Sequence, residues 1–379
     1  MNRKNQQTFN DTPSASGQRP EIERLISSRF SKLQPYDSIT PPEASGISIE
    51  DSIKLDGNEN PYGCSPKVQR ALARFAQYHI YPDPEQRELR GGLAKYANVS
   101  PECIIVGSGS DELIDLLLRL FVERGDKVIN CVPTFGMYQF CAEQYGAEVL
   151  SIPRTANFAL DVTRIEKAVD NRTKLVFIAS PNNPTGNTAT HEDISKIASI
   201  GPIVVVDEAY HEFSKVTTLP LRTQYENLLV LRTFSKWAGL AGLRVGYGIF
   251  PEQIVRLIDK IKQPYNVNAA GLIAASESLK DIKYLQGTIQ SIIEERGHMF
   301  NALSELEFLS PIPSEANFIL CDVLRGNAKE VYTKLKQQGI FIRYFDTPLL
   351  NNYIRISVGK PEHTQRLIKA LQDMDEKAN

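Results

Sequence analysis

Short apolar segments alternate with helical patterns between about residue 100 and residue 231, and no other feature of the sequence constrains the fold as strongly. The apolar segments, most of them rich in β-branched residues, are Ile104–Val106, Lys127–Cys131, Val149–Ile152, Lys174–Ala179, Ile203–Val206 and Leu228–Leu231. Each has the length and composition of a buried strand. Between the first two, one face of a helix that begins at Asp111 and Glu112 is apolar, through Leu113, Ile114, Leu117 and Phe121. Strands and helices in alternation predict an α/β fold with a doubly wound, mostly parallel sheet.

The pattern differs at both ends of the chain. Beyond about residue 285 it becomes helix, strand, helix, strand, strand and helix, which predicts a smaller α+β domain. The first 20 residues are polar, so we expect them to be disordered. A short helical stretch at about residues 20–30 then leads into an irregular arm that contains Pro35, Pro41, Pro42 and Gly46. We therefore expect a disordered extension (1–20), an arm that joins the small domain (21–65), a large domain (66–285) and a C-terminal small domain (286–379).

Composition narrows the classes of function. A net charge of −2 leaves no basic surface, so we expect no nucleic-acid partner. No apolar run reaches the roughly 18 residues that a membrane helix needs, and the first 20 residues lack the apolar centre of a signal peptide. We expect a cytoplasmic protein with no membrane partner. Five cysteines without a C-x-x-C spacing and five histidines without an H-x-x-x-H spacing predict that there is no metal site.

Polar segments follow several of the predicted strands, where α/β sheets collect ligand-binding groups. They are Ser180-Pro-Asn-Asn-Pro-Thr-Gly186, Asp207-Glu-Ala-Tyr210, Thr233-Phe-Ser-Lys236 and Gly107-Ser-Gly-Ser-Asp111. Taken singly, each also has an ordinary interpretation. Asp207 would suit a helix cap or a magnesium ligand, Lys236 would suit the surface, and the other two segments would suit a turn and a helix N-cap.

In order and spacing, these segments resemble the signature of the fold-type-I aminotransferases that depend on pyridoxal 5′-phosphate (PLP). The resemblance rests on Ser180–Gly186, Asp207–Tyr210, Ser235-Lys236 and Arg244, eight residues further on, and covers nearly the whole chain from about residue 50. It implies that PLP is the cofactor and that a large PLP-binding domain is joined to a smaller one.

The resemblance also assigns catalytic roles. It implies that Lys236 binds PLP as a Schiff base and then moves the Cα proton of the substrate. Asp207 would face the pyridine nitrogen and keep it protonated, so that PLP acts as an electron sink. Asn183 and Tyr210 would donate hydrogen bonds to the 3′-oxygen of the cofactor.

The remaining cofactor contacts follow from the same resemblance. The PLP phosphate would be bound by the helix start at Ser110 and Asp111, by Ser235 and by Arg244. Phe135 would stack on the ring at a position where relatives often carry tyrosine, although a core aromatic is the alternative. Tyr81 would reach the PLP phosphate of a neighbouring subunit, which implies a homodimer with shared active sites.

Four further segments are similar to those of histidinol-phosphate aminotransferases, namely Lys54-Leu-Asp-Gly-Asn-Glu-Asn-Pro-Tyr-Gly63, Tyr81-Pro-Asp-Pro-Glu85, Gly107-Ser-Gly-Ser-Asp-Glu112 and Ala316-Asn-Phe-Ile319. Arg343 and Arg355 match two arginines of that substrate site, although a surface position is the ordinary one for arginine. Asn60 and Tyr62 are expected to contact substrate as well. The implied reaction is a ping-pong exchange of an amino group between L-histidinol phosphate and 2-oxoglutarate, with glutamate as the partner product.

Three other functions fit parts of the pattern. An aromatic-amino-acid aminotransferase is the nearest alternative, and a phosphothreonine-type decarboxylase would use the same frame. A PLP-fold regulatory or binding protein is disfavoured, because the N-terminal segment of about 50 residues is too short and too weakly basic for a winged helix. The chain also keeps Lys236, which a catalytically inactive relative would most often lack.

Overall fold

The computed structural model describes residues 22–27, 30 and 33–375, so the predicted disorder of residues 1–20 lies outside the described part. The chain divides into two compact units, Met1–Pro35 and Tyr36–Asn379. In the first unit, the helix expected at about residues 20–30 is described only as a short 3₁₀ helix, η1 (Ile22–Leu25). The second unit contains both of the sheets described below.

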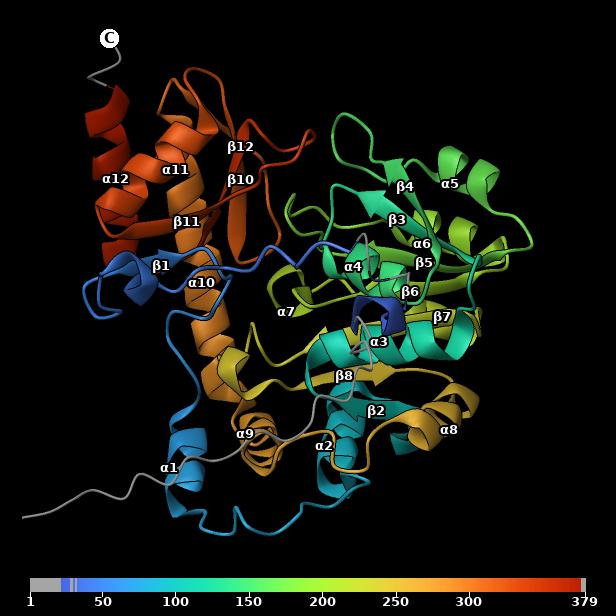
Figure 1. Cartoon of the computed structure of the whole chain (residues 1–379). Helices are drawn as coiled ribbons and strands as arrows, with labels where there is room; N and C mark the ends of the chain where they lie inside the picture. The colour runs from blue at the N-terminus through green and yellow to red at the C-terminus, as the bar shows by residue number, and fades with distance from the viewer. Residues whose placement is uncertain (1–21, 28–29, 31–32, 376–379) are drawn as a thin grey trace, which may run out of the picture. The chain divides into compact units, whose positions relative to one another are not determined.

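The larger sheet has seven strands in the order β2-β8-β7-β6-β5-β3-β4 (Figure 1). The strands are β2 (Ile104–Gly107), β3 (Lys127–Val132), β4 (Glu148–Pro153), β5 (Thr173–Ala179), β6 (Ile203–Asp207), β7 (Leu228–Thr233) and β8 (Gly246–Ile249). All neighbours pair in parallel except β8, which is antiparallel to both β2 and β7. The doubly wound, mostly parallel sheet is therefore confirmed, with all six predicted strands in it.

β8 is the strand that the sequence pattern did not indicate. Its sequence, Gly-Tyr-Gly-Ile, is short and half glycine, which is a weak strand signal. Packing explains the glycine at position 246, because a Cβ on Gly246 would lie 2.3 Å from the backbone nitrogen of Ser110. The absence of a side chain lets the start of helix α3 (Gly109–Phe121) approach the sheet closely.

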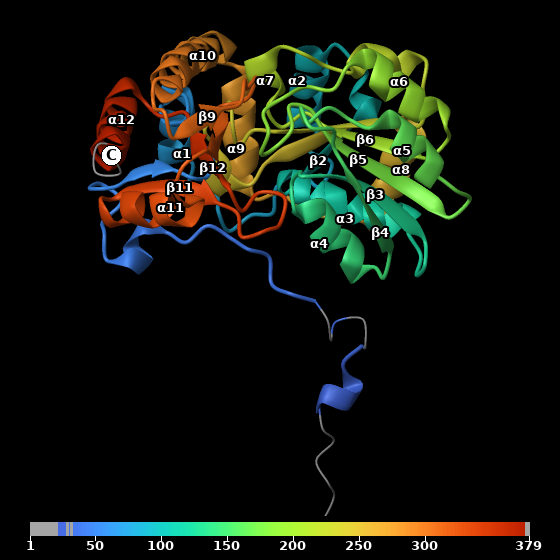
Figure 2. The same ribbon diagram turned by 90° about the horizontal axis from the view of Figure 1, so that it is seen from above.

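Alternating side chains of the central strands supply two separate cores, because successive residues of a strand point to opposite faces. In β5, Leu175 and Phe177 pack on the side of α3, α4 (Met137–Gln144) and α8 (Glu252–Ile261). Val176 and Ile178 pack on the side of α5 (Val162–Ala168) and α6 (His191–Ser199). Figure 2 shows α3 and α4 on one side of the sheet and α6 on the other.

The smaller sheet has five strands in the order β1-β11-β12-β10-β9. They are β1 (Ile53–Leu55), β9 (Leu309–Pro311), β10 (Phe318–Val323), β11 (Ile340–Tyr344) and β12 (Tyr353–Ser357), and only the β1–β11 pair is parallel. Its helices are α10 (Ile282–Ser304), α11 (Ala328–Gln337) and α12 (Pro361–Asp375). The predicted small α+β domain is confirmed, with β9 as an additional strand. The boundaries at residues 65 and 285 stay predictions, and the second lies in the first turn of α10.

The other described elements connect these layers. They are η3 (Pro42–Ser45), α1 (Pro66–Arg74), α2 (Arg87–Ala97), η4 (Pro101–Cys103), α7 (His211–Ser214), η5 (Leu219–Thr223), η6 (Ala241–Leu243) and α9 (Ala269–Leu279). Among the described helices, none combines the length and the apolar character that crossing a membrane requires. The parallel strands β5, β6 and β7 end at Ala179, Asp207 and Thr233, so the polar segments that follow them begin at one edge of the sheet.

Candidate active site

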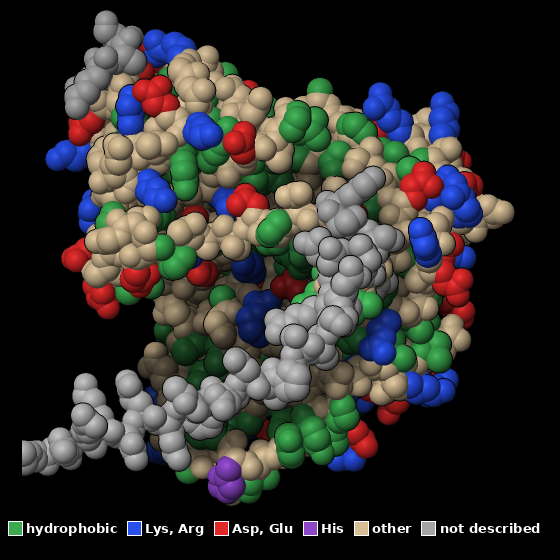
Figure 3. Space-filling model, in the orientation of Figure 1, with side chains coloured by type: hydrophobic (Ala, Val, Ile, Leu, Met, Phe, Trp, Pro, Cys, Tyr) green, Lys and Arg blue, Asp and Glu red, His purple; other side chains and the backbone are tan. Residues whose placement is uncertain are grey.

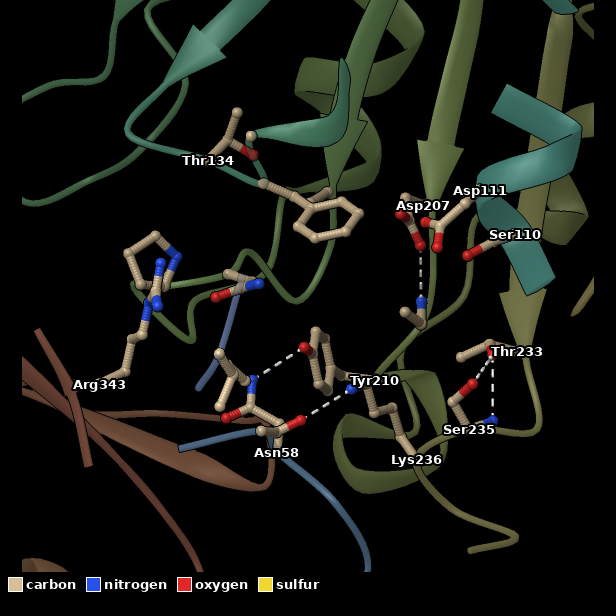
Figure 4. Close-up of a pocket in the computed structure, with 18 of the residues that line it drawn as sticks. Asn58, Ser110, Asp111, Thr134, Asp207, Tyr210, Thr233, Ser235, Lys236 and Arg343 are labelled. Atoms are coloured by element: carbon tan, nitrogen blue, oxygen red, sulfur yellow. Dashed lines mark hydrogen bonds between the residues drawn. The ribbon is translucent and has the colours of Figure 1, made fainter. Parts of the chain in front are cut away.

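A cavity of about 300 Å³ lies at this edge and is lined by both domains. The large domain supplies the segments after β3, β5, β6 and β7, and the small domain supplies residues of β11 and β12. Figure 3 shows a hollow between the two domains with basic side chains inside it. In Figure 4, Arg343 lies across the cavity from Ser110 and Asp111, with Lys236 and Tyr210 between them.

Lys236 follows β7 and is the amine of the cavity. Its Nζ donates a hydrogen bond of 3.0 Å to the carbonyl oxygen of Gly57. Burial, together with the positive charges of Arg355 and Arg244, lowers the pKa of Lys236 to about 8. The neutral, nucleophilic form of this amine is therefore far more populated near neutral pH than in an exposed lysine.

Asp207 is the last residue of β6 and is buried. The Tyr138 hydroxyl donates a hydrogen bond of 2.7 Å to its Oδ2, and the Ala209 backbone nitrogen donates one of 3.0 Å to its Oδ1. Burial raises the pKa of Asp207 to about 6, and these two hydrogen bonds oppose that rise. A buried carboxylate on the cavity wall favours a positively charged partner, such as a protonated ring nitrogen.

An anion cradle lies beside Asp207, at the N-terminus of α3. Ser110 and Asp111 form the first turn of that helix, Ser235 lies after β7, and all three line the cavity with Arg244. Arg244 Nη2 donates to Asp111 Oδ2 at 2.7 Å. Gly109 has φ of 77°, and a Cβ there would lie 2.6 Å from Arg244 Nη2, so glycine is required for the guanidinium to reach the helix start.

Tyr210 and Asn183 lie on the small-domain side of Lys236, where each already has a partner. Asn58 Nδ2 donates to the Tyr210 hydroxyl oxygen at 2.9 Å, and Arg355 Nη1 donates to Asn183 Oδ1 at 2.6 Å. Burial raises the pKa of Tyr210 to about 12, so the phenol is neutral at ordinary pH and can donate its proton. Arg355 thereby connects the small domain to the loop after β5.

Arg343 and Arg355 form a second basic site. They are paired positions on the antiparallel strands β11 and β12, and both line the cavity. The Phe345 ring lies under both guanidinium groups, with centroid distances of 5.5 Å and 5.7 Å. Arg355 is buried, which lowers its pKa to about 10, and among the described residues its Nε has no hydrogen-bond partner. Two adjacent guanidinium groups suit a multiply charged anion.

Phe135 lines the cavity, as expected, but three other predicted residues do not line it in this chain. Asn60 is buried and donates from Nδ2 to the Trp237 carbonyl oxygen at 2.9 Å. The Tyr62 ring lies 5.8 Å from Lys360 Nζ. Tyr81 is 76% exposed and stacks on Tyr265 with centroids 4.3 Å apart.

The structure also adds residues that the sequence did not single out, namely Tyr36, Asp37, Asn58, Thr134, Tyr138 and Phe345. Asn58 and Tyr138 had a weak signal, because Asn58 lies in the segment Lys54–Gly63 and Tyr138 lies three residues after Phe135. Thr134 has a similar signal, because it directly precedes Phe135, whereas Tyr36, Asp37 and Phe345 carry no motif that would have indicated them.

Comparison with known proteins supplies an independent result. The sequence profile of the family described as aminotransferase class I and II matches residues 50–371. A histidinol-phosphate aminotransferase from Dehalococcoides mccartyi is 47% identical over 355 residues, covering 94% of this chain and 99% of that protein. A chloroplastic histidinol-phosphate aminotransferase from Nicotiana tabacum is 45% identical and is covered over 88% of its length.

Solved structures agree with these matches. The crystal structure of histidinol-phosphate aminotransferase from Sinorhizobium meliloti in complex with pyridoxal-5′-phosphate has a TM-score of 0.83 at 28% identity, covering 94% of this chain and 100% of that one. The chain therefore belongs to the family of class I and II aminotransferases. The relatives just named place it in the histidinol-phosphate aminotransferase branch of that family.

The cavity fits PLP on grounds of its own chemistry. It offers an amine of lowered pKa at Lys236, a buried carboxylate at Asp207 and an anion cradle that depends on Gly109. These three groups match an aldehyde, a basic ring nitrogen and a phosphate, the functional groups of PLP.

Proposed function

We propose that this chain acts as a PLP-dependent histidinol-phosphate aminotransferase, which exchanges an amino group between L-histidinol phosphate and 2-oxoglutarate. The observation that carries the choice of substrate is the pair Arg343 and Arg355, which lines the same cavity as Lys236 and Asp207. An amine that also carries a phosphate needs both an amine-transfer centre and a strong anion site within reach of each other.

Each PLP contact is assigned to a residue of the cavity. Lys236 would hold the cofactor covalently, and Asn183 and Tyr210 would contact its 3′-oxygen. The backbone N–H groups of the helix start at Ser110 and Asp111, with Ser235 and Arg244, would hold its phosphate. Support comes from the shared cavity and from the helix start beside Arg244. When bound, PLP supplies an electron sink that stabilises negative charge at the substrate Cα.

The protein residues then perform the proton transfers and the orientation. Lys236 Nζ would take the proton from the substrate Cα in one half-reaction and would deliver a proton to Cα of the second substrate in the other, for which a pKa of about 8 is well placed. Asp207 keeps a proton on the ring nitrogen, and Tyr138 holds the carboxylate in place with its 2.7 Å hydrogen bond. Phe135 packs against the ring.

The arginine pair orients both substrates. In one half of the reaction, Arg343 and Arg355 bind the phosphate of histidinol phosphate, and in the other half they bind the carboxylate groups of glutamate. The Tyr36, Phe135 and Phe345 rings line the same cavity and suit a flat imidazole ring. The same rings are the one observation that favours the second candidate, an aromatic-amino-acid aminotransferase.

We further propose a homodimer. Tyr81 is exposed and lies outside the cavity of its own chain, as expected of a residue that completes the site of a second subunit. Tyr62 also lies outside that cavity, so a direct contact with substrate would require the second subunit, whereas Asn60 is buried in its own chain. The five free cysteines support a reducing compartment such as the cytoplasm, whereas the tobacco relative is a chloroplastic protein.

The two half-reactions test this proposal. Holoenzyme mixed with L-histidinol phosphate and no acceptor is expected to change the visible absorbance of its cofactor, and 2-oxoglutarate is expected to restore it. L-phenylalanine serves as the matched donor without a phosphate and is expected to react more slowly. A fast change with phenylalanine and none with histidinol phosphate would replace the proposed substrate with the aromatic one.

A further inference from the structure

Arg343 is already bound to an anionic group of its own chain. Its Nη2 donates to Asp37 Oδ2 at 2.5 Å and to the Asp37 carbonyl oxygen at 2.9 Å. The side chain of Arg343 is 17% exposed, whereas that of Asp37 is 79% exposed. The Asp37 carboxylate, from the N-terminal arm, therefore binds the same guanidinium that is proposed to bind the substrate anion.

The neighbouring residue keeps this carboxylate close to Arg343. The Tyr36 ring packs edge-on against Phe135 and Phe140, with centroid distances of 6.4 Å and 5.8 Å. Among the described residues, no backbone–backbone hydrogen bond ties residues 36–39 to another segment, although the Asp37 carbonyl oxygen accepts from the Arg343 side chain. The Tyr36 side chain thus anchors residues 36–39, but no strand pairing fixes their backbone. This arrangement allows the Asp37 carboxylate to leave Arg343 and return to it.

Pairing is important because Arg343 is largely withdrawn from water. An unpaired guanidinium in such a place costs free energy, and the cost would fall on the enzyme each time a product departs. A ping-pong exchange requires that departure in every half-reaction, before the second substrate can enter. A carboxylate held near by at high effective concentration removes the cost.

We propose that Asp37 is an exchangeable counter-ion for Arg343, displaced when a substrate anion binds and restored when the product leaves. This role rests on the proposed function, since it takes Arg343 as a substrate-binding residue. It makes Asp37 a positioning residue, which acts only through Arg343. Its consequence is weaker anion binding and faster anion release than the arginine pair alone would give.

The test is a double-mutant cycle on anion binding by the holoenzyme. Calorimetry with inorganic phosphate as the probe gives the dissociation constant for wild type, Asp37→Asn, Arg343→Gln and the double variant, without any turnover. Asp37→Asn is expected to bind phosphate about two- to fivefold more tightly, the range of a partly exposed ion pair. Arg343→Gln is expected to bind it more weakly, and Asp37→Asn is expected to have no effect in the Arg343→Gln background.

Asp346→Asn is the matched control. Asp346 follows the same strand as Arg343 and is 77% exposed, but it pairs with Lys329 at 3.5 Å. Its substitution changes the net charge equally and is expected to leave phosphate binding unchanged. Equal tightening by Asp346→Asn, or by Asp37→Asn in the Arg343→Gln background, would reduce the effect to general electrostatics and overturn the counter-ion role.

The two hypotheses fail in different ways. If Arg343→Gln weakens binding but Asp37→Asn changes nothing, the counter-ion role is wrong and the proposed substrate site stands. If Arg343→Gln binds phosphate as the wild type does, the anion site itself is wrong, and the role of Asp37 is wrong with it.

Discussion

The Tyr138 hydroxyl donates a 2.7 Å hydrogen bond to Asp207 Oδ2, between two buried side chains of the large domain. Tyr138 comes from α4 and stacks on Phe177 of β5, with centroids 4.8 Å apart. The carboxylate proposed to hold the ring-nitrogen proton is therefore oriented by a residue of α4 that the sequence indicated only weakly, through its place three residues after Phe135. Tyr138 lowers the pKa of Asp207 against the stronger effect of burial.

Tyr138→Phe removes that hydrogen bond and keeps the stacking ring. The pKa of Asp207 should then rise above about 6, so that the carboxylate is lost at a higher pH. We expect kcat/KM to fall by about tenfold or more, as for the loss of a hydrogen bond to a charged group, and the acid limb of its pH profile to move upward. A profile with an unmoved acid limb would contradict the role given to Tyr138.

The lowered pKa of Lys236 predicts how fast apoenzyme captures PLP. Only the neutral amine attacks the aldehyde, so the rate should rise with pH and level off above about 8. At pH 7 roughly a tenth of the enzyme carries the reactive form, far more than an exposed lysine would provide. Borohydride trapping after short mixing times, from pH 6 to 10, measures the profile, and Lys236→Ala supplies the blank. A midpoint above pH 10 would mean that burial does not act on this amine.

Substitutions in the arginine pair should separate anion binding from amine chemistry. Arg343→Gln should raise KM for histidinol phosphate by about tenfold to a hundredfold, the value of a charge-assisted hydrogen bond, with kcat little changed. Arg355→Gln should lower kcat/KM more than Arg343→Gln does, because Arg355 Nη1 also donates to Asn183 Oδ1 at 2.6 Å. Steady-state kinetics provide the measurement, with thermal unfolding to confirm that the variants are folded. Retention of wild-type KM by both variants would place the phosphate elsewhere.

A buried ion pair close to the site should contribute to stability rather than to chemistry. Arg232 Nη2 and Glu208 Oε2 lie 2.8 Å apart, and both side chains are almost fully buried. Glu208→Gln would leave the arginine charge uncompensated, so we expect the free energy of unfolding to fall by about 3–5 kcal/mol. The exposed pair Glu192–Lys196 is the control, and Glu192→Gln should leave the free energy of unfolding nearly unchanged. Denaturant titration of both variants tests the difference, and equal effects would contradict it.

The sequence predicted those parts of the molecule in which a local pattern and a tertiary role coincide. The six strands were visible because each is a short apolar run, and all but the edge strand β4 are largely buried. β8 was not visible, since two of its four residues are glycines required for close packing. Lys236 and Asp207 were visible because Asp207 ends one of these six strands and Lys236 closely follows another. Tyr138 enters the cavity through helix packing, a long-range effect that its place near Phe135 indicated only weakly.

The N-terminal arm is a second part of the site that the sequence did not indicate. Tyr36 and Asp37 line the cavity, yet their segment has no periodicity and no turn signal that would place it there. Asn60 and Tyr62, which lie in a recognisable segment, line no part of the cavity in their own chain. Proximity in sequence to a motif therefore did not predict proximity to the site.

The most direct test of the substrate is the specificity of the purified holoenzyme for its amino donor. With 2-oxoglutarate as acceptor, kcat/KM is measured for L-histidinol phosphate and for L-phenylalanine under the same conditions. The arginine pair predicts a preference for histidinol phosphate of roughly a hundredfold or more, since phenylalanine lacks the phosphate that the pair would bind with charge-assisted hydrogen bonds. An equal or higher value for phenylalanine would contradict the proposed function and identify the chain as an aromatic-amino-acid aminotransferase.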